Sequence, residues 1–205
     1  MPNPSFSGDP KAEWLSETGF DRRMRLLEPF WFRDRADKRW DAAAGSVIDG
    51  ASIPKALWAL VGSPYTGEYR RASIVHDIAC VEADGDQGKR RLADKMFFAA
   101  CRAGGCSRWE ATVLYVGVRI GAWASLYEPL EGERQIKIQC DSADRQIQED
   151  FRTACELVLR QGETDDADIV HERTEAALQA VAAVRLVSLD RTQRMASMAG
   201  PGRMK

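Results

Sequence analysis

Two kinds of hydrophobic pattern divide the chain near residue 50. Before that point, strand-forming residues fill the runs 25–33 and 39–48, which a polar turn at 34–38 separates. Such runs on either side of a turn predict a β-hairpin or a small antiparallel sheet. Pro29 lies inside the first run. Because proline has no backbone N–H to donate, it indicates an edge strand or a bulge there.

The later pattern is helical and predicts helices over residues 53–61, 68–82, 89–103 and 107–127. Ser52 can cap the first of these with its hydroxyl, and Pro54 suits a first turn, where a missing N–H costs nothing. Ser107 and Glu110 have the spacing of a capping box, in which each side chain binds the other residue's backbone N–H. We therefore expect a well-defined start for the fourth helix.

The two ends of the chain differ from its middle. The first twenty residues contain three prolines and predict an extended arm, which Trp14, Leu15 and Phe20 would pin to the body of the protein. Beyond residue 130, a polar segment holds Ile136 and Ile138 in the alternation of a short strand, and two amphipathic helices follow.

These patterns predict an α+β fold, with a small antiparallel β-hairpin or sheet packed on a bundle of roughly three to four helices and a helical C-terminal extension. The expected organisation is an extended arm over 1–20, an α+β core domain over 21–130, a helical extension over 131–190 and a disordered tail over 191–205.

Composition and charge narrow the function classes. The chain of 205 residues is 44% hydrophobic and 29% charged, with a formal net charge of −2, so no overall basic field favours nucleic acid or an anionic membrane. Six arginines precede the predicted helices, and we interpret them as a solvated face: Arg22, Arg23, Arg25, Arg33, Arg35 and Arg39. No apolar run is long enough to span a membrane. Five cysteines without C-x-x-C spacing favour a reduced cytosolic setting, with these residues acting as small core side chains.

The chain has two histidines, and His76 stands beside Asp77 in a mostly apolar predicted helix. Asp94 lies among apolar residues of the next helix, and Asp49 ends the β-rich segment. One histidine and three aspartates suffice for a divalent metal site, with Asp49, His76 and Asp94 as ligands, or for a histidine general base that a carboxylate orients.

Each of these residues also has a structural interpretation. His76 can be a core histidine, and Asp77 and Asp94 can pair with nearby arginines or, for Asp94, with Lys95. Asp49 can bind its own backbone in a turn. Ser52 lacks the G-x-S-x-G context of a nucleophile. The second histidine, His171, lies in a polar helix and is expected on the solvated surface.

The order of these motifs resembles an uncharacterised family, domain of unknown function 1353 (DUF1353). The resemblance rests on Asp49-Gly-Ala-Ser-Ile-Pro54 with Trp58, the helix bearing His76-Asp77, the segment Ala93-Asp-Lys-Met-Phe-Phe98 and the apolar helix after residue 111. It covers about residues 20 to 127, and residues 41–45 replace the family's usual proline-containing entry to the first motif. It implies that Asp49, Ser52, His76, Asp77 and Asp94 are motif positions. It also implies an origin in bacteriophages or prophages, so the expected location is the bacterial cytoplasm or the virion.

Two functions remain open at this stage. In a hydrolase, Asp49, His76, Asp77 and Asp94 would meet in an open cleft, where one divalent ion or the histidine activates water. In a non-enzymatic accessory or virion-associated protein, the same groups would form a structural latch that is closed to solvent. The C-terminal helices would then supply a surface for a protein partner or for self-association.

Overall fold

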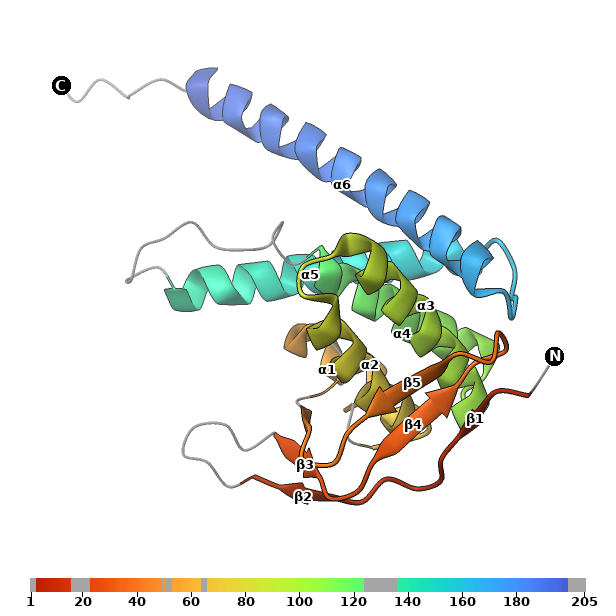
Figure 1. Ribbon diagram of the computed structural model, residues 1–205. Helices are drawn as coiled ribbons and strands as arrows, with labels where there is room; N and C mark the ends of the chain where they lie inside the picture. The colour runs from red at the N-terminus through yellow and green to blue at the C-terminus, as the bar shows by residue number, and fades with distance from the viewer. Residues whose placement is uncertain are drawn as a thin grey trace.

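The computed structural model describes residues 3–15, 23–48, 50, 53–63, 66–123 and 136–198, with the backbone alone at 136–143, 186 and 188–198. The β-strands lie together at one end of the molecule, and the helices stack above them (Figure 1). The predicted α+β class with C-terminal helices is confirmed.

Within the described residues, six short strands form two antiparallel sheets of three strands each. One sheet has the order β1–β4–β5, made of Ser5–Phe6, Phe30–Arg33 and Arg39–Ala42. The other has the order β2–β3–β6, made of Ala12–Trp14, Met24–Leu26 and Val47–Ile48. The predicted hairpin is β4–β5, in which Phe32 pairs with Trp40. Pro29 marks neither an edge strand nor a bulge; it lies between β3 and β4, where the chain passes from one sheet to the other.

The N-terminal arm takes part in both sheets through β1 and β2. Its anchor is Phe6, whose ring centroid lies 4.9 Å from that of Phe32 and 5.8 Å from that of Phe30. The expectation that Trp14 pins the arm is wrong, because this side chain on β2 is 57% exposed. Leu15 is half-buried, and Phe20 lies outside the described residues.

The helices follow the predicted order. They are the 3₁₀ turn η1 (Lys55–Leu57) and the α-helices α1 (Trp58–Val61), α2 (Arg70–Ala83), α3 (Gln87–Gly104), α4 (Arg108–Ala122), α5 (Ile136–Leu159) and α6 (Ala167–Met198). Ser107 and Glu110 form the predicted capping box at the start of α4. At the end of α3, Gly105 has a φ of 114°, a left-handed conformation that glycine adopts at little cost.

Three local expectations are corrected. The predicted helix 53–61 is only η1 followed by the single turn α1, with Pro54 at the cap position and no side-chain cap; Ser52 lies outside the described residues. Ile136 and Ile138 belong to α5 rather than to a strand. The helix α6 continues to Met198, so residues 191–198 of the expected tail are helical.

The C-terminal helices contribute to the same apolar core as the helices before them. Phe151 and Val158 of α5, and Val170 and Leu178 of α6, are buried in one cluster with residues of α2, α3 and α4. The apolar contacts therefore continue across the expected domain boundary at residue 130. Further along α6, Val184 and Val187 are exposed, and the carboxyl end of the helix projects outward (Figure 1).

Candidate functional site

The site is a row of polar side chains inside the helical layer, centred on His76 of α2 and Asp94 of α3. Both side chains are fully buried, with 0% of their surface exposed. The His76 Nε2 atom lies 2.8 Å from Asp94 Oδ1, and this contact joins the two helices. The ring of His76 also packs at 4.8 Å between centroids on the ring of Phe97. The structure therefore brings together two of the four predicted site residues, and it does so in the core.

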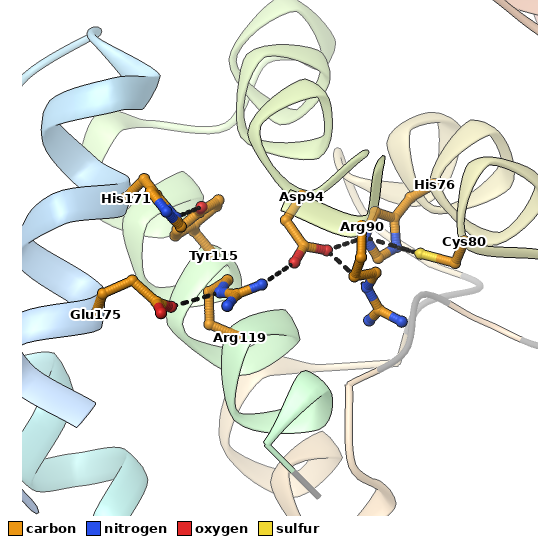
Figure 2. Close-up of polar contacts among 8 residues, drawn as sticks. All are labelled: His76, Cys80, Arg90, Asp94, Tyr115, Arg119, His171 and Glu175. Atoms are coloured by element: carbon orange, nitrogen blue, oxygen red, sulfur yellow. Dashed lines mark hydrogen bonds and ion pairs between the residues drawn. The ribbon is translucent and has the colours of Figure 1, made fainter. Parts of the chain in front are cut away.

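Two arginines complete the shell around the Asp94 carboxylate (Figure 2). Arg90, one turn earlier on α3, donates its Nε–H to Oδ1 at 3.1 Å, and Arg119 of α4 donates from Nη1 to Oδ2 at 2.5 Å. Arg119 is itself 3% exposed, and its Nε–H reaches Glu175 Oε1 of α6 at 2.7 Å. Polar contacts thus run without a break from α2 through α3 and α4 to α6.

The network is ionised at neutral pH. Burial alone would lower the pKa of His76, but the hydrogen bond to Asp94 and the neighbouring Cys80 outweigh it and raise that pKa to about 9. Burial alone would raise the pKa of Asp94, but its hydrogen bond to His76 and the charges of His76 and Arg90 hold it at about 2. His76 is therefore an imidazolium that faces a carboxylate. An imidazolium has no lone pair with which to accept a proton or bind a metal.

Asp77 serves a different junction. Consecutive helix residues point about 100° apart, so Asp77 turns away from the His76–Asp94 contact. Its Oδ2 atom accepts a hydrogen bond of 2.8 Å from the backbone N–H of Gly50, and this ties the loop after the β-rich segment to α2. Asp49 lies outside the described residues, so its approach to His76 stays a prediction. The neighbouring Gly50 does lie against α2.

Cys80 is a site residue that the sequence interpretation treated only as a core side chain. It lies one turn after His76 on α2, with Sγ 3.4 Å from His76 Nε2, and the ligand atoms of His76, Cys80 and Asp94 fall within 4.8 Å of one another. The i,i+4 spacing of His76 and Cys80 was the available signal, because such residues share a helix face.

These three residue types can bind zinc, but their surroundings fit a metal poorly. Both oxygens of Asp94 already accept hydrogen bonds, and one of them is also bound to the imidazole. The two guanidinium groups on the carboxylate would repel a dication. A metal would therefore have to displace contacts that are already made and overcome two nearby positive charges.

Other expectations about individual side chains are now decided. His171 is not a solvated surface residue: it is half-buried on α6, and its Nδ1 atom lies 2.8 Å from the hydroxyl of Tyr115 on α4. Burial lowers the pKa of His171 and raises that of Tyr115. Asp94 pairs with Arg90 as expected, whereas Lys95 binds Asp168 of α6 at 2.6 Å.

Comparison with known proteins finds a family similar to the part of the chain that holds the site. Residues 24–118 match the family described as "Protein of unknown function (DUF1353)". This segment is similar to DUF1353 and makes up a little under half of the chain. The predicted resemblance is thus confirmed, and His76, Asp77 and Asp94 lie inside the matched segment, whereas Arg119 and Glu175 lie beyond it.

Two curated relatives come from Sinorhizobium fredii (strain NBRC 101917 / NGR234). The chain is 32% identical over 119 residues to "Uncharacterized protein y4jT", an alignment that covers 56% of this chain and 33% of that protein. It is 30% identical over 99 residues to "Uncharacterized protein y4iH", covering 48% of this chain and 40% of that protein. The chain therefore spans well under half the length of either relative. No solved structure matches it. Among the described residues, none of the helices is long and apolar enough to cross a membrane.

Proposed function

We propose that the His76–Asp94 network is a structural latch, and that the protein is a non-enzymatic accessory protein of a bacterium or of a phage. The observation that carries this proposal is the complete burial of both side chains, together with a partner on each carboxylate oxygen of Asp94. A hydrolytic centre needs a path for substrate and water to the reacting atoms. A group that is sealed in the core and held in its charged form serves packing better than catalysis.

The proposed latch makes two sets of contacts, one among the helices and one between α2 and the loop at Gly50. On one side, His76 and Asp94 hold α2 against α3, and Arg119 extends the contact to α4 and α6. On the other side, Asp77 holds the loop at Gly50. The DUF1353-like segment would then be a rigid support that presents the C-terminal helices.

Two exposed valines in the carboxyl half of α6 support a role for the C-terminal helices in protein association. Val184 is 72% exposed and Val187 is 70% exposed, three residues apart on the helix. Large apolar side chains at this spacing form a stripe that another helix can cover. We propose this stripe as the surface for a protein partner or for a second copy of the chain, either in the bacterial cytoplasm or in the virion.

A metal-dependent hydrolase is the second candidate, and the cluster of His76, Cys80 and Asp94 is the observation that favours it. Metal binding would require His76 to lose a proton and the Asp94 carboxylate to give up its hydrogen bond to one arginine so that it can bind the ion. Asp49 would then complete the ligand set from the loop.

Measuring metal content and stability on the same samples separates the two candidates. Wild-type protein and the variant His76→Ala would be purified with added zinc or manganese, then analysed for bound metal and by thermal unfolding. The latch predicts no stoichiometric metal in either protein and a much lower unfolding temperature for the variant. One equivalent of metal in the wild type that is absent from His76→Ala would support the hydrolase and refute the latch as the main role.

A further inference from the structure

Cys101 and Cys106 form a thiol pair at the carboxyl end of α3, two helical turns beyond Asp94. The backbone N–H of Cys106 donates to the carbonyl of Cys101 at 3.1 Å, which closes the turn that ends the helix. Both cysteines are free thiols, and they lie close enough that each shifts the pKa of the other. Two thiols that the closed turn brings near each other are candidates for a disulfide.

A cavity gives small molecules a route to one of the two thiols. It has a volume of about 340 Å³ and lies between α1, the start of α2 and the start of α4. Cys106 lines it together with Val61, Tyr69, Trp109 and Leu114, whereas Cys101 is not among its lining residues. Both side chains are buried, Cys101 at 0% exposed and Cys106 at 2%, and of the two only Cys106 borders the cavity. The geometry thus distinguishes an outer thiol, Cys106, from an inner thiol, Cys101.

The surroundings of Cys106 favour its thiolate. It immediately precedes Ser107, the residue that caps the amino end of α4, where the helix dipole stabilises negative charge. Arg102 donates from Nη1 to the carbonyl oxygen of Cys106, so a guanidinium lies nearby. The hydrogen bond from Cys101 lowers the pKa of Cys106, although burial and the carboxylates of Glu110 and Glu68 oppose this effect. Burial raises the pKa of Cys101 well above its usual value.

We propose that Cys106 and Cys101 are a redox-active dithiol that reacts with a low-molecular-weight disulfide entering through this cavity. The Cys106 thiolate attacks one sulfur of the small disulfide, forms a mixed disulfide and releases one small thiolate. Cys101 then gives up its proton and attacks the Cys106 sulfur, which releases the second small thiol. Two electrons pass from the protein to the small disulfide, and the protein gains one intramolecular disulfide while losing two hydrogen atoms.

The sequence offers a direct readout of this disulfide. Trypsin cleaves after Lys95, Arg102 and Arg108, so it places Cys101 in the peptide 96–102 and Cys106 in the peptide 103–108. Only a disulfide keeps these two peptides together. Folded full-length protein would be incubated with oxidised glutathione, quenched with N-ethylmaleimide, digested and analysed by mass spectrometry without reduction.

We expect the linked peptide pair in the wild type and its disappearance on reduction. The variant Cys101→Ala should stop at the mixed disulfide and retain glutathione on Cys106. The variant Cys106→Ala should show neither product in these peptides. Cys155→Ala is the matched control, because Cys155 is another buried free cysteine but lies on α5, and this variant should still form the linked pair.

Two results would overturn the proposal. One is separate, fully alkylated peptides 96–102 and 103–108 from folded wild type under conditions in which the half-buried Cys80 acquires glutathione. The other is a linked pair that forms faster in urea-unfolded protein than in the folded protein, because the fold would then not promote the reaction. Neither result bears on the latch, which involves neither Cys101 nor Cys106.

Discussion

Replacing Asp94 with asparagine tests the latch most directly, because the change keeps the shape of the side chain and removes its charge. In the native structure this carboxylate accepts hydrogen bonds from His76, Arg90 and Arg119 within 3.1 Å and is fully buried. Asparagine offers one acceptor oxygen, and its NH₂ group would face donors where the second carboxylate oxygen stood. At least one buried cation would lose its partner.

The cost follows from that burial. Removing one partner of a buried ion pair costs about 3–5 kcal/mol, because the remaining charge stays desolvated. The free energy of unfolding of an ordinary domain is about 5–15 kcal/mol, so this loss is a large share of the total stability. For a chain of this length, a melting temperature lower by roughly 10 °C is expected.

The assay is denaturant and thermal unfolding followed by circular dichroism, with Asp168→Asn as the matched control. Asp168 also contacts a cation, Lys95 at 2.6 Å, but its side chain is 75% exposed, so its loss should cost no more than about 1 kcal/mol. If Asp94→Asn destabilises the protein no more than Asp168→Asn does, the network does not hold the helices together and the latch is refuted.

Three further outcomes follow from the same structure. The pKa of His76 is raised from 6.5 to about 9, so its stabilising contribution should be complete below pH 6.5 and lost as the pH rises through 9. The pKa of Asp94 is lowered from 3.8 to about 2, so its contribution should be present above pH 3.8 and lost as the pH falls through 2. Unfolding titrations across both windows check this, and a His76→Gln variant with the same alkaline loss would contradict it. Glu175→Gln should cost about 1–3 kcal/mol by weakening the partner of buried Arg119, and amide exchange should then increase in α6 before it increases in α2; an unchanged α6 would argue against this coupling. Gly104→Ala should destabilise the protein by about 1–3 kcal/mol, because a Cβ there would lie 2.7 Å from the backbone oxygen of Glu68, and calorimetry showing a neutral effect would contradict that packing.

The helices of the site could be predicted from sequence because their signals are local. The capping box at Ser107 and the helical patterns before and after residue 85 depend on residues a few positions apart. They predicted the starts of α2, α3 and α4 within a few residues. The predicted end of the last helix was too late, because α4 ends at Ala122; residues 124–127 lie outside the described part of the chain. The choice of partners is not local. Arg119 and Glu175 are 56 positions apart, and no spacing rule connects them.

The environment of His171 also could not be predicted from its neighbours in the sequence. Its neighbours along the chain are polar, so its sequence context indicates a solvated residue. Its actual environment is set by Tyr115, a residue of a different helix that comes close only when α6 packs on α4. The separate directions of His76 and Asp77 were predictable from helix geometry alone, whereas the burial of His76 depends on how α3 packs against α2.

The contact between Arg119 and Asp94 has a practical consequence for dissecting the protein. The family match ends at residue 118, one position before the arginine that neutralises the buried carboxylate, and the glutamate that steadies this arginine comes from α6. A fragment cut at the family boundary would leave Asp94 without Arg119 and would uncover the apolar faces beneath α5 and α6. Expression of an isolated domain should therefore extend at least through Val181, the last described residue of the shared core.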